Sequence, residues 1–109
     1  MRFRDIAQMR EALARAELTL FHLEILLAIE VSEGETMFDI MGRGMLHNEV
    51  RPSTTAKAIQ RLAEGTSRTP GKHLVKREAS AHNANAQSLY LTPAGKEVLS
   101  SLKKELNIK

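Results

Sequence analysis

The chain has no cysteine and no tryptophan, and aromatic residues make up only 4% of its 109 positions. The lack of cysteine excludes a disulfide framework, a thiolate zinc site and a thiol redox sensor. With so few aromatic residues, a core has to consist mainly of Leu, Ile, Val, Met and Ala. The hydrophobic content of 42% is sufficient for such a core, and the length suits one compact domain over residues 1–109.

Long apolar runs are absent as well. No stretch of about 18 consecutive apolar residues occurs, so the sequence predicts no membrane-spanning helix. The first ten residues, MRFRDIAQMR, interrupt their apolar positions with charges and lack the apolar block of a signal peptide. We therefore expect a soluble, cytoplasmic protein with no membrane partner.

The residue patterns of catalysis and metal binding are also missing. His22, His47, His73 and His82 lie far apart in the sequence and lack the spacing of metal ligands. No carboxylate pair, Ser/His/Asp set or nucleotide-binding motif stands out. We therefore predict no catalytic residue, no metal site and no cofactor, and we do not expect an enzyme.

Charge is distributed unevenly along the chain, although the net charge is only +3. Residues 17–39 contain six acids and no Lys or Arg, whereas residues 43–77 contain eight bases and two acids. A segregated basic half is typical of a protein that binds a polyanion. Chance clustering on a solubilising surface gives the same distribution, so charge alone leaves both interpretations open.

Periodicity predicts the secondary-structure elements. Helices are expected at residues 2–17, from Thr19 to about Ser32, and from near Thr36 onward. The second of these, LFHLEILLAIEV, is apolar nearly all round, which is typical of a helix packed on several sides. HLVKREA and SLYLT alternate as strands around the polar loop SAHNANAQ and predict a β-hairpin. A final helix follows a Thr-Pro start at residues 92–93.

The segment RPSTTAKAIQRL, residues 51–62, predicts an amphipathic helix that begins near Pro52. On a helical wheel its apolar side chains fall within a sector of about 100°. That inner face consists of Thr55, Ala58, Ile59 and Leu62. The opposite face is hydroxyl-rich and cationic, and consists of Ser53, Thr54, Lys57, Gln60, Arg61 and Glu64.

The order of these elements predicts the fold class. Two helices joined by a turn and followed by a β-hairpin form a winged helix-turn-helix. We therefore expect a mainly α protein with a small β-hairpin, in which flanking N- and C-terminal helices accompany a winged helix-turn-helix domain. The core is assigned to residues 19–92, and the flanking helices to residues 1–18 and 93–109.

Three segments together resemble the MarR-type winged-helix transcriptional regulators. They are RPSTTAKAIQRLAEG, HLVKRE and SLYLTPAGKEVL, and the resemblance covers roughly residues 20–102. In that family a Pro-Ser-Thr-type recognition helix precedes a Leu-Val-x-Arg strand, and a Leu-Thr-x-x-Gly step leads into the last helix. The resemblance implies a transcriptional regulator that binds double-stranded DNA sequence-specifically. It also implies a homodimer formed by residues 1–18 and 93–109, and allows a small-molecule effector that the sequence does not name.

The predicted DNA contacts form two groups. Lys57 and Arg61 lie four residues apart and point the same way, with only Glu64 available to offset them on that face. Hydroxyls in the first turn of a helix suit phosphate oxygens, and N-capping is their alternative role. The first group is Arg51, Ser53, Thr54, Lys57 and Arg61, and the second group is Arg68, Lys72, Lys76 and Arg77, with Arg77 at the base of the wing.

The sequence departs from the family pattern in two loops. The wing tip, AHNANAQ, has no Arg or Lys where the family usually carries an Asp-Arg-Arg-like sequence. GTSRTPGK, residues 65–72, is longer than the tight turn usual before the wing. Two alternative functions stay open: a DNA-binding factor in plasmid or phage partition or replication, and a winged-helix protein-interaction module. The uncharged wing tip and the acidic residues 17–39 motivate the second alternative.

Overall fold

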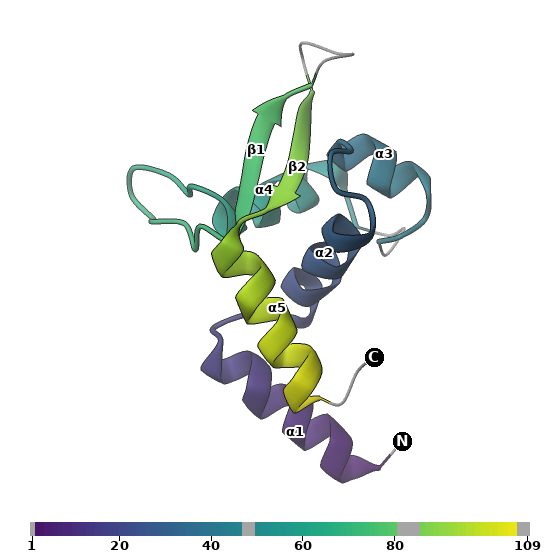
Figure 1. Cartoon of the computed structure of the whole chain (residues 1–109), viewed down its shortest axis with the longest axis vertical. Coiled ribbons are helices and arrows are strands. Elements are labelled where there is room, and N and C mark those ends of the chain that lie inside the picture. The colour runs from purple at the N-terminus through teal and green to yellow at the C-terminus, as the bar shows by residue number, and fades with distance from the viewer. Residues whose placement is uncertain (1, 47–49, 81–85, 107–109) are drawn as a thin grey trace.

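The described part of the chain contains five helices and one β-hairpin, in the order predicted from the sequence (Figure 1). The computed structural model describes residues 2–46, 50–80 and 86–106. Helices α1 and α5 lie together at one end of the molecule, and the hairpin rises from the other end. The elements are α1 (Phe3–Arg15), α2 (Leu20–Val31), α3 (Met37–Gly42), α4 (Pro52–Leu62), β1 (Val75–Ala79), β2 (Gln87–Leu91) and α5 (Pro93–Glu105).

Threonine side chains fix the starts of three helices. Thr19, Thr36 and Thr92 are the N-caps of α2, α3 and α5, and each hydroxyl accepts a backbone N–H from three residues later, at 3.0 to 3.2 Å. Such a cap satisfies one of the N–H groups that a helix start leaves without a partner. In α3 the Asp39 carboxylate also accepts the Thr36 N–H, and the hydrogen bonds to Thr36 lower the pKa of Asp39.

The core lies where α2, α4, α5 and the hairpin meet. Its centre is formed by Leu26, Ile29, Leu62 and Leu99, which are fully buried. Helix α2 contributes buried side chains from several directions, as its nearly all-round apolar sequence predicted. This helix is therefore the support against which α4 and the hairpin are held.

The predicted hairpin is confirmed; β1 is two residues shorter than its sequence pattern, and β2 has the expected length but begins and ends one residue earlier. Strands β1 and β2 pair antiparallel, and Arg77 lies opposite Leu89. A short segment before α3 pairs with the other edge of β2: the Gly34 N–H donates to the Leu89 carbonyl (2.8 Å), and the Leu89 N–H donates to the Glu35 carbonyl (2.9 Å). The start of α3 is thereby tied to the wing. The wing-tip residues 81–85 lie outside the described residues.

His22 participates in the cap of α2, which makes the stability of the fold depend on pH. Its ring Nδ1 accepts the Thr19 N–H at 3.2 Å. Burial lowers the pKa of His22 from its ordinary value of 6.5, and the positive charges of Lys72 and Arg61 lower it further. Because the unfolded chain binds this proton more readily than the folded chain, the stabilisation is fully present above pH 6.5. It is lost as the pH falls through that value towards the lowered pKa of the folded state.

We therefore expect the free energy of unfolding to decrease between roughly pH 7 and pH 5. Urea unfolding at a series of pH values measures this dependence. The variant His22→Gln should flatten the curve, because it removes the titrating ring. His73→Asn, which replaces an exposed histidine in a left-handed backbone conformation that Asn tolerates, should keep the slope. Equal slopes in wild type and His22→Gln would contradict the assignment.

Candidate nucleic-acid interface

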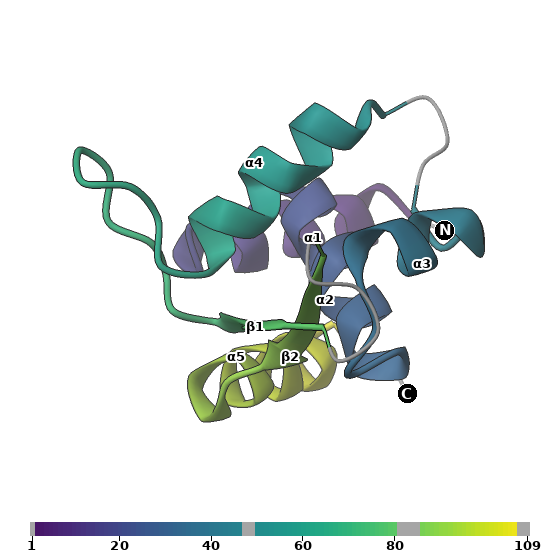
Figure 2. The same ribbon diagram turned by 90° about the horizontal axis from the view of Figure 1, so that it is seen from above.

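Helix α4 divides into an inner and an outer face as its wheel predicted. Thr55, Ile59 and Leu62 are buried, and the Thr55 hydroxyl donates to the Arg51 carbonyl at 3.3 Å. The inner face rests on α2 and α3, and the outer side of the helix carries no other element (Figure 2). This arrangement presents α4 as a ridge along one side of the molecule.

The outer face of α4 carries the predicted contact residues. Ser53, Thr54, Lys57 and Arg61 are all exposed, so their predicted orientation is confirmed. Their contact with DNA stays a prediction. The side chains combine two hydroxyls in the first turn with two cations one helical turn apart.

The start of α4 differs from the starts of α2, α3 and α5. Its N-cap is Arg51, which makes no side-chain cap hydrogen bond, and Pro52 occupies the first turn. Neither Ser53 nor Thr54 is therefore the capping residue, and the alternative capping role for these hydroxyls is wrong. The positive end of the helix dipole and two exposed hydroxyls occur together at this end, and both favour an anion.

The cations of α4 are free of acidic partners. Over residues 2–46, 50–80 and 86–106, Arg51, Lys57 and Arg61 form no ion pair. Glu64, the acid on their face, is instead paired with Arg77 of β1, whose Nε lies 3.4 Å from the Glu64 carboxylate. The positive charge of Lys57 and Arg61 is consequently directed at solvent without neutralisation.

The second predicted group does not form a single cluster. Lys72 has only 16% of its side chain exposed and lies 3.8 Å from the carboxylate of Glu17. Lys76 bonds Glu78 at 2.6 Å, and this hydrogen bond and charge raise the pKa of Lys76. Arg77, a neighbour in the strand, points to the other face of the hairpin, towards Glu64. Arg68 stands apart from all three on the loop between α4 and β1, without an acidic partner among the described residues.

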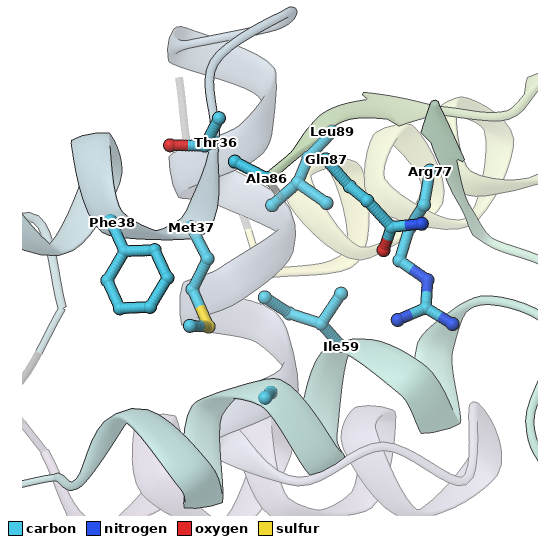
Figure 3. A pocket seen from close by; sticks show the side chains of 9 residues that line it. Thr36, Met37, Phe38, Ile59, Arg77, Ala86, Gln87 and Leu89 are labelled. Atoms are coloured by element: carbon cyan, nitrogen blue, oxygen red, sulfur yellow. The ribbon is translucent and has the colours of Figure 1, made fainter. Parts of the chain in front are cut away.

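A cavity of about 190 Å³ lies between α3, α4 and the hairpin (Figure 3). Met37, Phe38, Ile59 and Leu89 line it, and Arg77 lies at one end. Phe38 is a large apolar residue, yet 62% of it is exposed. Sequence reasoning did not find this cavity, because its walls come from three segments that only the fold brings together.

The described residues show neither a metal-binding cluster nor a membrane-spanning helix. They contain no group of three or more His, Cys, Asp or Glu side chains placed to hold a metal ion. No helix among them is both long enough and apolar enough to cross a membrane.

Three solved structures with a similar arrangement are MarR or a MarR-family regulator. The apo form of wild-type MarR from E. coli matches with a TM-score of 0.76 and 14% identity, over 95% of this chain and 68% of that chain. A cysteine-to-serine mutant of the same protein matches with the same values. A MarR-family transcriptional regulator from Silicibacter pomeroyi matches with a TM-score of 0.69 and 23% identity, over 95% of this chain and 62% of that chain.

The chain has the MarR fold. The predicted fold class, a mainly helical winged helix-turn-helix, is thereby confirmed. No protein-family model and no curated protein sequence matches the chain. Within the MarR fold, α3 and α4 are the two helices of the helix-turn-helix, and β1 and β2 form the wing. At these identities the likeness describes the fold, and the roles of individual residues have to be argued from their geometry.

Proposed function

We propose that the protein is a transcriptional regulator that binds double-stranded DNA sequence-specifically and reads the major groove with α4. One observation carries the proposal: Lys57 and Arg61 project from the outer face of the second helix of a helix-turn-helix, and their nearest acid is occupied by Arg77. An unneutralised cationic face on a helix is suited to a polyanion, and the major groove, about 12 Å wide, admits a helix.

The exposed contact residues of α4 have roles that follow from their positions. Lys57 and Arg61, in the middle and last turns, reach base edges or phosphates in the groove. Ser53 and Thr54, together with the first-turn N–H groups, hold a phosphate and fix the register of the helix on the backbone. Arg51, at the N-cap, adds a backbone contact beside them.

We also propose a homodimer that uses residues 1–18 and 93–109. Helices α1 and α5 are joined by a hydrogen bond from Gln8 to the Glu105 carbonyl (2.8 Å) and by an ion pair between Arg15 and Glu105. Beside this contact Phe3 is 80% exposed, and Ile6 and Leu20 are more than half exposed. A two-fold dimer that buries such a face would place two α4 helices on an inverted repeat. Sedimentation equilibrium measures the oligomeric state.

Selection from a pool of random-sequence duplexes tests the proposed function. We expect an enriched sequence arranged as an inverted repeat, and the logarithm of its binding constant should fall linearly with the logarithm of the salt concentration. No enrichment, together with no duplex binding at low salt, would contradict it.

The structure weakens one of the two arguments for the protein-interaction alternative, the acidic residues 17–39. Four of the six acids in residues 17–39 are paired with cations of this chain rather than free for a partner. They are Glu17, Glu30, Glu33 and Glu35.

A further inference from the structure

The loop after α4 is an ordered arm, which we define as residues 65–71. It leaves the C-terminal end of α4 and projects from the body of the molecule (Figure 2). Its returning segment is bonded to the helix end: the N–H groups of residues 71, 72, 73 and 74 donate to the carbonyls of residues 64, 61, 63 and 62, at 2.8 to 3.2 Å. The last carbonyls of a helix otherwise lack partners. The arm is therefore held by the end of α4.

Two glycines allow the two sides of the arm to lie in backbone contact. Gly65 has a φ of +74°, and a Cβ added there would lie 2.2 Å from the Gly71 nitrogen. A Cβ on Gly71 would lie 2.1 Å from the Ala63 carbonyl oxygen. At the tip, the Thr66 N–H donates to the Thr69 carbonyl (2.8 Å), and the Thr69 N–H donates to the Thr66 hydroxyl (3.0 Å). The tip conformation is thus fixed by local bonds.

The side chains at the tip of the arm are of the types that contact phosphates. Its four residues, Thr-Ser-Arg-Thr at 66–69, are all exposed, and the arm contains no acid. Arg68 forms no ion pair within the described part of the chain, in contrast to Lys72, Lys76 and Arg77. Arginine and hydroxyl side chains supply many of the contacts that proteins make to DNA phosphates. The arm therefore presents a free cation beside hydroxyl donors.

The position of the arm places this tip beside the groove. With 11 residues, α4 is about 16 Å long, which exceeds the major-groove width of about 12 Å. When α4 occupies the groove, its C-terminal end comes close to the sugar-phosphate backbone that borders it. We propose that the arm is a second DNA-binding element, in which Arg68 contacts a phosphate of the flanking backbone. This inference rests on the proposed function and adds a contact outside α4 and the wing.

Binding of Arg68→Ala to the duplex selected from the random pool tests the arm. Loss of one phosphate contact per protomer should weaken binding several-fold on all sequences, and should reduce the slope of log K against log salt by about 0.9 for each protomer bound. Arg68→Lys keeps the charge and should retain most of the affinity. Circular dichroism of each variant checks that the fold is kept.

A trimmed duplex locates the contact. When the base pairs flanking the α4 site are removed, the wild type should lose affinity and Arg68→Ala should not, so that the two bind equally. If Arg68→Ala has the wild-type salt slope while Lys57→Ala and Arg61→Ala weaken binding, the arm proposal is overturned and the proposed function stands. If none of these variants weakens binding, both are overturned.

Discussion

Replacing Lys57 and Arg61 together by alanine is expected to weaken binding to the selected duplex by about a hundredfold or more. Each good base contact contributes roughly 1–3 kcal/mol of discrimination, and 1.4 kcal/mol corresponds to a tenfold change in affinity. Both side chains are exposed and lack ion pairs in the described part of the chain, so their removal breaks no internal contact of that kind. Fluorescence anisotropy of labelled duplex over a salt series measures the loss.

The single variants distinguish a base contact from a phosphate contact. A residue that reads a base should relax the sequence preference at one position when it is replaced. A residue that meets a phosphate should weaken binding to all sequences and reduce the salt slope by about one. Lys57→Arg and Arg61→Lys are the controls, because each keeps the positive charge at its position and should keep the salt slope. Affinity and slope unchanged in the double variant would show that α4 does not contact the DNA.

The second large effect concerns stability. Leu62→Ala is expected to lower the free energy of unfolding by about 2–5 kcal/mol, the usual range for a fully buried leucine. Leu62 has no exposed surface, and its carbonyl accepts the Leu74 N–H at 2.8 Å, so it lies where α4, the arm and the wing are joined. The cavity left by the truncation would form at this junction.

Urea unfolding of Leu62→Ala beside Lys57→Ala measures this effect with an internal control. Lys57 lies on the outer face of the same helix, and its replacement should change the stability by no more than about 0.5 kcal/mol. The two variants should therefore separate the roles of the two faces: one for the fold and one for DNA. Equal stability of the two proteins would contradict the packing described for α4.

Features that depend on neighbouring residues could be predicted from the sequence. Thr19 and Thr92 identified helix starts because a cap acts on N–H groups only two or three residues away. The apolar stripe of α4 identified its buried face because helical periodicity alone determines which side chains share a side. The alternation in residues 73–79 and 88–92 indicated the hairpin for the same reason.

Features that depend on distant residues could not be predicted. Glu64 and Arg77 are 13 residues apart, and their pairing follows from the angle at which the wing packs on α4. The sequence therefore showed Glu64 as a neighbour of Lys57 and Arg61, and could not show that it is occupied. The exposure of Phe38 depends in the same way on how the wing and α4 stand beside α3. The closure of residues 65–71 into an arm depends on backbone bonds to residues 61–64, which Gly65 and Gly71 permit but whose partners they do not identify.

A single cysteine placed on α4 tests the central claim, that this helix lies in the major groove, most directly. Because the chain has no cysteine, Ser53→Cys carries one attachment point for a reagent that cleaves DNA, and Val31→Cys at the end of α2 is an exposed control. We predict strand cleavage centred on the major groove of the selected sequence with Ser53→Cys, and background cleavage with Val31→Cys. Cleavage directed by Val31→Cys, with none from Ser53→Cys, would show that another face of the protein binds the DNA.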